Sequence, residues 1–246
     1  MSEFKIPTET VKLPSKGLLY PKESPLAKGE VEMKYMTAKE EDILTNSNYI
    51  RNNTVIDKLL QSMIVTSIDY NELLVGDKNA ILIAARVLGY GKDYNVTYNG
   101  KEYNVDLSQL EDKKVDESLF TAGVNDFPFT LPQTGNTVTF KILTHGDEQK
   151  IEAEIKGLQK VNPNATTDVT TRLKYIITSI NGNRDTKAIR EFADTMLAQD
   201  ARALRQHYSK ITPDIDMRFK PNDENYVGEG IEFTPGLNFF WPDAGV

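Results

Sequence analysis

The sequence predicts an α+β protein with a mainly helical body in two clusters, short β-hairpins, and extended N- and C-terminal segments. Three observations predict this fold class. Apolar residues recur at helical spacing in two separate stretches. Two other stretches alternate apolar and polar residues on either side of a glycine-containing turn. Prolines are concentrated near the N-terminus, and 246 residues are enough for one large domain or two small ones.

The composition excludes several classes of protein. The chain has no cysteine, which excludes disulfides, thiol nucleophiles and thiolate-bound metals. Its two histidines, His145 and His207, are too few to hold a metal alone, and we interpret both as surface residues or as residues with satisfied hydrogen bonds. A net charge of −7 argues against nucleic acid as a partner. We therefore predict no cofactor, no metal site and no nucleic-acid binding.

The sequence shows no signal for export or membrane insertion. Its first residues lack the apolar stretch of a secretory signal. The longest apolar run, residues 80–85, is far shorter than the roughly 20 residues that span a bilayer. We expect a cytoplasmic protein without stable membrane insertion.

Residues 1–36 are expected to form an extended N-terminal arm, because four prolines exclude a long helix there. Short strands are expected at residues 9–13 and 30–35. The apolar side chains of the arm indicate that it docks on something, and both a partner protein and the chain's own body are open as the docking surface. These candidate partner-binding residues are Leu13, Leu18, Leu19 and Tyr20.

Residues 37–126 are expected to form a helical cluster followed by a hairpin. Thr37 and Glu40 have the spacing of a capping box, which predicts a helix over residues 38–44. Similar spacings predict a helix after Thr54 and a turn at residues 69–72, and Asp77 is expected to cap a helix over 78–88. An Asn-Gly pair at 99–100 predicts a type I′ hairpin over residues 94–105, with turns and loops after it.

Residues 127–212 are expected to form a second hairpin and a helical bundle. Alternating residues predict strands at 127–131 and 138–142. Thr144 and Asp147 start the next helix. Thr167 is expected to start a helix that continues to Ile180, and Asp185 and Asp200 to start two more. No repeat with a period of 20–50 residues is evident.

Residues 213–246 are expected to form an irregular or β module, because they combine turn-forming residues with many aromatic ones. Two interpretations of the final aromatic cluster are open. It either closes the protein's own core or binds a partner as an anchor. The candidate anchor residues are Phe239, Phe240 and Trp241.

The sequence contains no convincing catalytic group. The glycines of residues 89–92 lack the spacing of a phosphate-binding loop and are explained by the end of a helix. The acidic run at residues 40–42 lies in the first turn of a predicted helix, where negative charge is favourable. We therefore predict no catalytic, cofactor-binding or metal-binding residues.

A set of short segments, taken in order, resembles the baseplate hub and hub-assembly proteins of T4-like phages with contractile tails. Each segment is short, so the resemblance depends on their order along nearly the whole chain. The segments are residues 11–20 (VKLPSKGLLY), 29–33 (GEVEM), 36–44 (MTAKEEDIL), 57–60 (DKLL), 73–77 (LLVGD), 80–90, 197–204 (LAQDARAL) and 239–242 (FFWP).

The resemblance implies a structural or assembly role in the tail baseplate without enzyme activity. Similar proteins often carry Cys-x-x-Cys pairs that suggest zinc-ribbon hairpins, one after the helix that ends here at Tyr90 and one before the terminal aromatic motif. This chain has no cysteine, so zinc does not carry over. A metal-free hairpin is expected at the Asn99-Gly100 turn, and another in the stretch 221–230.

We therefore expect a non-enzymatic protein that contacts other baseplate and hub proteins, with self-association left open. It is expected in the host cytoplasm during assembly and, if it is a component of the virion, in the tail baseplate. A transient assembly chaperone that leaves before the tail is complete is an alternative. A small hydrolase of the hub is a further alternative, which would require a pair of carboxylates in a cleft.

Overall fold

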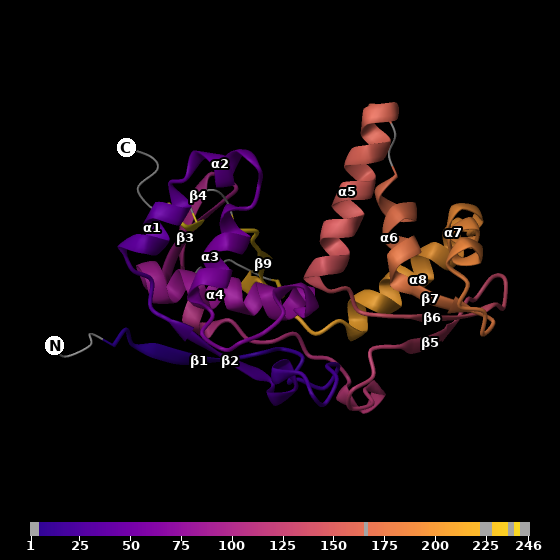
Figure 1. Ribbon diagram of the computed structural model, residues 1–246, viewed down its shortest axis with the longest axis horizontal. Coiled ribbons are helices and arrows are strands. Elements are labelled where there is room, and N and C mark those ends of the chain that lie inside the picture. The colour runs from indigo at the N-terminus through magenta and orange to yellow at the C-terminus, as the bar shows by residue number, and fades with distance from the viewer. Residues whose placement is uncertain (1–4, 165–166, 222–227, 236–238, 242–246) are drawn as a thin grey trace.

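The computed structural model describes residues 5–164, 167–221, 228–235 and 239–241, and these form an α+β fold (Figure 1). The predicted fold class is confirmed. Helices dominate, and each small sheet is antiparallel. Parts of the two predicted terminal segments lie outside the described residues, namely 1–4, 222–227, 236–238 and 242–246. Within that part, no helix combines the length and apolarity that crossing a membrane requires.

The first half of the chain forms a hairpin with helices packed above it (Figure 1). After the third helix, Ile64 bridges to Met33 and the N–H of Val65 donates to the carbonyl of Glu32, so this segment extends the hairpin on its β2 side. The elements are β1 (Thr8–Lys12), β2 (Glu30–Lys34), α1 (Ala38–Leu44), α2 (Ser47–Arg51), α3 (Val55–Met63) and α4 (Val75–Tyr90), with 3₁₀ turns at Pro25–Lys28 and Tyr70–Glu72.

The second half has the same architecture. A hairpin is extended by a third strand, giving the order β5-β6-β7, and helices pack above it. The predicted hairpin is confirmed. The elements are β5 (Phe127–Thr130), β6 (Thr137–Phe140), α5 (His145–Val161), α6 (Asp168–Ile176), β7 (Ile177–Ile180), α7 (Thr186–Thr195) and α8 (Ala198–Ile211).

Two small hairpins complete the fold. The Asn-Gly hairpin is confirmed as β3 (Asp93–Tyr98) and β4 (Lys101–Asp106), with positive φ angles of 51° and 75° at Asn99 and Gly100. Two 3₁₀ turns follow, at Leu107–Gln109 and Glu117–Leu119. Near the C-terminus β8 (Arg218–Phe219) pairs with β9 (Ile231–Glu232). The aromatic residues after it pack on the first small hairpin, where the rings of Phe239 and Tyr94 lie 5.0 Å apart.

The two halves are an internal repeat whose period is longer than the 20–50 residues of common repeat proteins. The last strand of each main hairpin leads into a helix through the pattern Val-x-[Met/Phe]-Lys-x-[Met/Leu]-Thr-x-x-[Glu/Asp], at residues 31–40 and 138–147. Both threonines form a capping box with the acidic residue. Both lysines also form an ion pair with that residue, over 2.9 Å from Lys34 to Glu40 and 2.7 Å from Lys141 to Asp147.

A second shared pattern joins the turn of each hairpin to the last helix of its repeat. The turns have the sequence Leu-Pro-x-x-Gly at residues 13–17 and 131–135, and the helices begin Leu-x-x-Asp at 74–77 and 197–200. Asp77 accepts a hydrogen bond from the N–H of Ser15 over 2.9 Å. Asp200 accepts the equivalent bond from the N–H of Gln133 over 2.8 Å. Both carboxylates are fully buried.

The repeats are arranged head to tail (Figure 1). We call residues 8–90 the first repeat and residues 127–211 the second repeat. Each has a turn end, where the hairpin turn meets the start of the last helix, and a junction end, where the second strand leads into the first upright helix. The turn end of the first repeat lies against the junction end of the second, because Leu74 bridges to Thr144.

The short strands predicted in residues 1–36 are present as β1 and β2, which pair with each other as the hairpin of the first repeat. Two details differ from the predictions. Asp77 and Asp200 do not start helices, because α4 and α8 begin two residues earlier and both side chains bind hairpin turns. The helix from Thr167 ends at Ile176, because the β-branched residues after it pair with β6 as a strand.

Candidate functional site between the two repeats

The contact between the repeats begins with a short β-bridge. The N–H of Val75 donates to the carbonyl of Leu143 over 3.1 Å, and the N–H of His145 donates to the carbonyl of Leu73 over 2.7 Å. Leu73, Leu74 and Leu143 are buried. This bridge fixes the start of α4 against the start of α5.

A polar cluster lies beside the bridge and joins residues of both repeats. Lys78 of α4 donates to Asp57 of α3 over 2.6 Å and lies 3.1 Å from Nδ1 of His145 on α5. The hydroxyl of Tyr70 donates to the same Asp57 oxygen over 3.1 Å. The Tyr70 ring also packs edge-on against the imidazole at 4.7 Å. The cluster therefore holds α3, α4 and α5 together.

The environment of His145 favours its neutral form. Burial lowers the pKa of His145 below its ordinary value, and the positive charge of Lys78 lowers it further, although Asp57 opposes this. Because Lys78 donates toward Nδ1, the ring proton belongs on Nε2, which faces a carboxylate oxygen of Asp57 at 3.5 Å. A neutral imidazole here accepts from lysine on one side and faces the carboxylate on the other.

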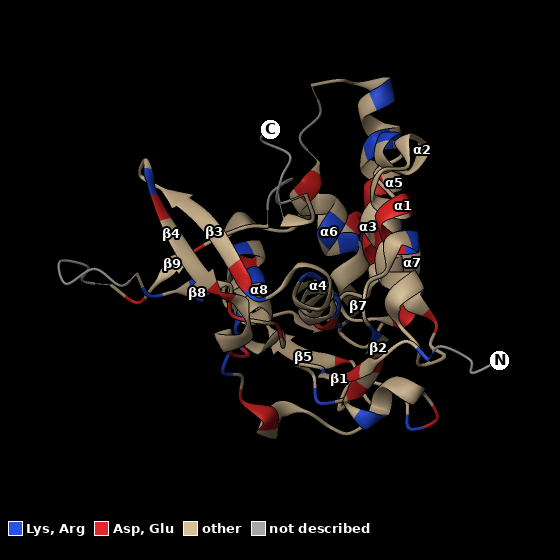
Figure 2. Ribbon diagram, turned by 90° about the vertical axis from the view of Figure 1, so that its left-hand side faces the viewer, with Lys and Arg blue, Asp and Glu red and all other residues tan. Residues whose placement is uncertain are grey.

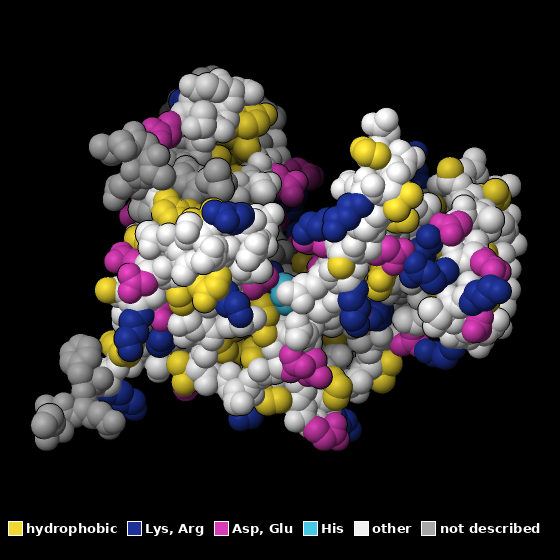
Figure 3. Space-filling view, turned by 45° about the horizontal axis from the view of Figure 1, so that its top comes forward, with side chains coloured by type: hydrophobic (Ala, Val, Ile, Leu, Met, Phe, Trp, Pro, Cys, Tyr) yellow, Lys and Arg dark blue, Asp and Glu magenta, His cyan; other side chains and the backbone are white. Residues whose placement is uncertain are grey.

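Two cavities flank the contact between the repeats. One, of about 470 Å³, lies over the polar cluster and is lined mainly by α3, the start of α4 and α5. Figure 3 shows the hollow between the first repeat and the projecting α5. The other, of about 680 Å³, is lined by apolar residues such as Leu19 and Pro21, which follow the first hairpin turn, and by polar residues such as Gln149 of α5. Both openings expose surface that belongs to two repeats at once.

The polar side chains of this site carry charges of both signs. Its histidine, lysine and aspartate are engaged with one another, and the side chains of Glu148, Glu152 and Lys156 add charges of both signs along α5. Figure 2 shows the same mixture of acidic and basic residues over much of the ribbon. Among the described residues, no group of three or more histidine, aspartate or glutamate side chains is placed to hold a metal ion.

The predicted partner-binding residues of the N-terminal arm do not lie at this site as exposed side chains. Leu13, Leu19 and Tyr20 are buried in the core, and Leu18 is half-buried. The Tyr20 hydroxyl donates to Asp77 over 2.6 Å and accepts from the N–H of Leu74. The arm therefore docks on its own repeat, which is one of the two surfaces that the sequence left open.

The predicted aromatic anchor is also largely internal. Phe239 and Phe240 are buried, and Trp241 is half-buried against the same core. Of the two interpretations, the structure therefore places these rings in the protein's own core. Their predicted role in binding a partner stays a prediction.

The residues that join the repeats were not identified from the sequence as a cluster. His145 was interpreted as a surface residue or one with satisfied hydrogen bonds, and it is 4% exposed. The available signal was the departure of one repeat from the other, because His145 and Gly146 replace Ala38 and Lys39 in the shared pattern. His207 lies instead within the second repeat, stacked on Phe129 at 4.7 Å between ring centres.

No protein family, curated protein or solved structure with which we compared the chain matches it. The functional argument therefore depends on the residues and their arrangement.

Proposed function

We propose that the chain is a non-enzymatic protein of a contractile phage tail, acting as a baseplate hub component or hub-assembly factor through protein–protein contacts. The ordered set of segments that resembles the hub and hub-assembly proteins carries this proposal. Two of these segments take part in the contacts of the buried aspartates. Residues 11–20 contain the hairpin turn that binds Asp77, and residues 197–204 contain Asp200, which binds the second hairpin turn. They support a shared fold rather than a shared reaction.

The exposed apolar residues support a role in protein contact. The upright pair α5 and α6 projects from the body (Figure 1) and exposes Leu158, Val161 and Val169 near its tip. Val161 is 87% exposed, which is unusual for a valine on a helix. A small group of apolar side chains at the tip of a projection is accessible to a partner without rearrangement of the core.

The test is capture of the tagged full-length chain from cells infected by a T4-like phage, with the captured proteins identified by mass spectrometry. We expect other baseplate or hub proteins, and we expect Val161→Asp to reduce their capture while leaving the fold intact by circular dichroism. The matched control is Lys160→Asp, which changes a polar position beside it. The proposal is wrong if no baseplate protein is captured above an untagged control.

A second measurement separates a component from a transient chaperone. Purified virions are analysed by quantitative mass spectrometry. Stoichiometric copies support a hub component. Absence from virions, together with capture during infection, supports an assembly factor that leaves.

A further inference from the structure

The free turn end of the second repeat exposes what the first repeat buries. Leu197 occupies the position of Leu74, directly before the last helix of its repeat. Leu74 is 2% exposed because the second repeat covers it, whereas Leu197 is 48% exposed. The backbone is the same at both positions, with φ and ψ of −61° and 145° at Leu74 and −63° and 140° at Leu197. Leu197 therefore has the conformation that forms the bridge at Leu74.

The free junction end of the first repeat shows the same contrast. Tyr35 occupies the position of Ile142, and it is 37% exposed whereas Ile142 is fully buried. Thr37 corresponds to Thr144, the residue that bridges to Leu74. Both threonines have extended backbone before a capping box. Within residues 5–164 and 167–221, the molecule thus presents both halves of its internal contact, one at each end.

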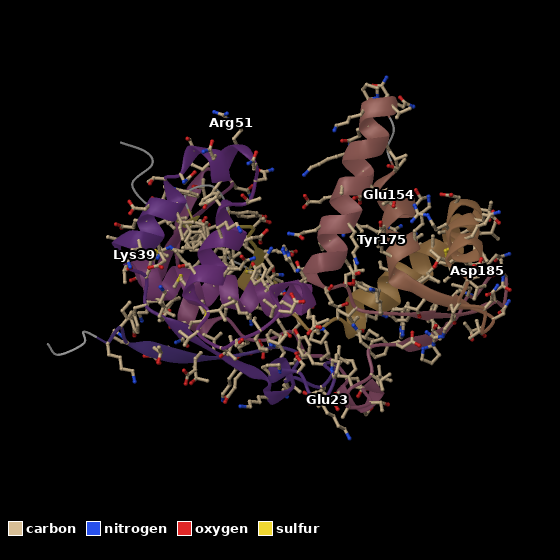
Figure 4. The ribbon with its side chains drawn as sticks, in the orientation of Figure 1. Glu23, Lys39, Arg51, Glu154, Tyr175 and Asp185 are labelled. Carbon is tan, nitrogen blue, oxygen red and sulfur yellow. The ribbon has the colours of Figure 1, made fainter. Side chains whose placement is uncertain are left out.

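One pair of equivalent residues at the two free ends is opposite in charge. In the internal contact Gly146 lies against Asn71. The equivalent residues at the free ends are Lys39 on α1 and Asp194 in the last turn of α7. Figure 4 shows Lys39 at one end of the molecule and Asp185, at the start of α7, at the other. The Asp194 side chain is half-exposed and pairs with Lys174 over 2.7 Å, which leaves it accessible to a second cation.

We propose that the chain self-associates head to tail, with the turn end of the second repeat in one copy bound to the junction end of the first repeat in the next. Leu197 bridges to Thr37 of the next copy, as Leu74 bridges to Thr144 within the chain. Because the two surfaces differ, the contact is heterologous, and repeating it produces a ring if the rotation closes or an open chain if it does not. The inference depends on the internal contact and not on the proposed tail function.

The internal contact contains two glycines that the proposed contact between two copies of the chain lacks. A Cβ on Gly76 would lie 1.9 Å from the carbonyl oxygen of Pro213, which follows the second repeat shortly after α8, and a Cβ on Gly146 would lie 3.1 Å from Asn71. Gln199 and Lys39 stand at the equivalent positions of the free ends. The contact between copies is therefore weaker than the internal one, and Gln199→Gly should strengthen it.

The first experiment uses disulfide trapping, because the chain has no cysteine of its own. Full-length Leu197→Cys and Thr37→Cys proteins are mixed under mild oxidation. Neighbouring side chains of this kind of bridge are close enough for a disulfide. We expect a disulfide-linked heterodimer to form at least tenfold faster than with the control pair Val161→Cys and Thr37→Cys. The double variant Leu74→Cys with Thr144→Cys, in one chain, calibrates the reaction at the internal contact.

The proposal is overturned if that internal disulfide forms while the mixed pair reacts no faster than the control. It is also overturned if Leu197→Cys alone dimerises faster than the mixture, because that result indicates a symmetric contact.

The second experiment is sedimentation velocity over a range of protein concentrations. We expect concentration-dependent association of the wild type, tighter association of Gln199→Gly, and association weakened about tenfold or more in Leu197→Asp or Tyr35→Asp. Mixing these two aspartate variants restores one intact pair of ends and should give dimers only. Circular dichroism confirms that each variant is folded. Monomers for both the wild type and Gln199→Gly at every concentration contradict the proposal.

Discussion

The two hairpin turns of the repeats share a sequence pattern and a buried aspartate but differ in their surroundings. Pro14, Ser15 and Gly17 of the first turn are buried, whereas the equivalent Pro132, Gln133 and Gly135 are exposed. The first turn is covered by a 3₁₀ turn and by neighbouring loops, and the second lies at a free end. The comparison teaches that a local pattern determines local conformation, while the position of a repeat in the chain determines how much each residue contributes to stability.

The strongest test of this comparison is alanine at the two turn glycines. Gly17 and Gly135 have φ angles of 76° and 71°, so both substitutions introduce left-handed strain. A Cβ on Gly17 would also lie 2.4 Å from the carbonyl oxygen of Ala27, whereas one on Gly135 meets nothing within 4 Å. We expect Gly17→Ala to lower the free energy of unfolding by about 4 kcal/mol and Gly135→Ala by about 1 kcal/mol. Urea unfolding measures both, and equal losses would contradict the comparison.

The buried aspartates give the next largest effect. Asp77→Ala leaves the Ser15 hydroxyl, the Ser15 N–H and the Tyr20 hydroxyl without their acceptor inside the protein. Asp200→Ala removes the acceptor of the Gln133 N–H and of the Thr134 hydroxyl, but both residues are exposed, so water can replace the lost acceptor. We expect losses of about 3 kcal/mol and about 2 kcal/mol respectively.

Urea unfolding with the tryptophan signal and with circular dichroism reports these losses. A larger loss for Asp200→Ala than for Asp77→Ala would show that the burial of the hydrogen-bond donors does not determine which substitution costs more free energy of unfolding.

The capping box of the first repeat predicts a dependence on pH. Burial alone would raise the pKa of Glu40, but hydrogen bonds from Ser62, Thr37 and Lys34 outweigh it and lower the pKa to about 2. Because the folded pKa lies below the ordinary value of 4.5, this stabilisation is complete above pH 4.5 and is lost as the pH falls toward 2. We expect Glu40→Gln to cost about 2 kcal/mol at pH 7 and little at pH 2.

Chemical denaturation from pH 7 to pH 2 measures this difference. A cost for Glu40→Gln that stays constant over the range would contradict the low pKa of Glu40.

The smallest expected effect concerns the cluster that joins the repeats. Lys78 pairs with Asp57 in a partly buried site, whereas Lys156 pairs with Glu152 on an exposed face of α5. We expect Lys78→Ala to lower the free energy of unfolding by about 1 kcal/mol and Lys156→Ala by less than about 0.5 kcal/mol. Thermal unfolding of the two variants, measured side by side, tests whether the contact between repeats carries the difference.

Much of the fold could be predicted from local patterns. The Asn-Gly hairpin, the hairpin around Gly135 and the helix starts at Thr37, Thr144 and Asp185 follow from side chains that act on their own neighbours. The end of α6 could not be predicted in this way. Residues 177–180 continue an apolar helical pattern, and only pairing with β6 makes them a strand.

The candidate site depended still more on tertiary structure. Asp77 and Asp200 have the position of helix-capping residues in the sequence, but their partners Ser15 and Gln133 lie 62 and 67 residues away in the chain. The repeat is difficult to recognise in the sequence because few positions match. The connections between the matching positions also differ in length, and before the last helix the second repeat has α7 where the first repeat has only the 3₁₀ turn at Tyr70–Glu72. A search by short period could not find it.

The order of synthesis gives the contact between the repeats a further consequence. Leu73 and Leu74 are completed early, but the residues that cover them, Leu143 to His145, are made about 70 residues later. At a synthesis rate of roughly 5–20 residues per second, several seconds pass before the residues that cover these leucines are made. The first hairpin and its helices are already available to fold in the nascent chain during that time. During that interval the first repeat has the same open turn end that the finished protein keeps only at Leu197.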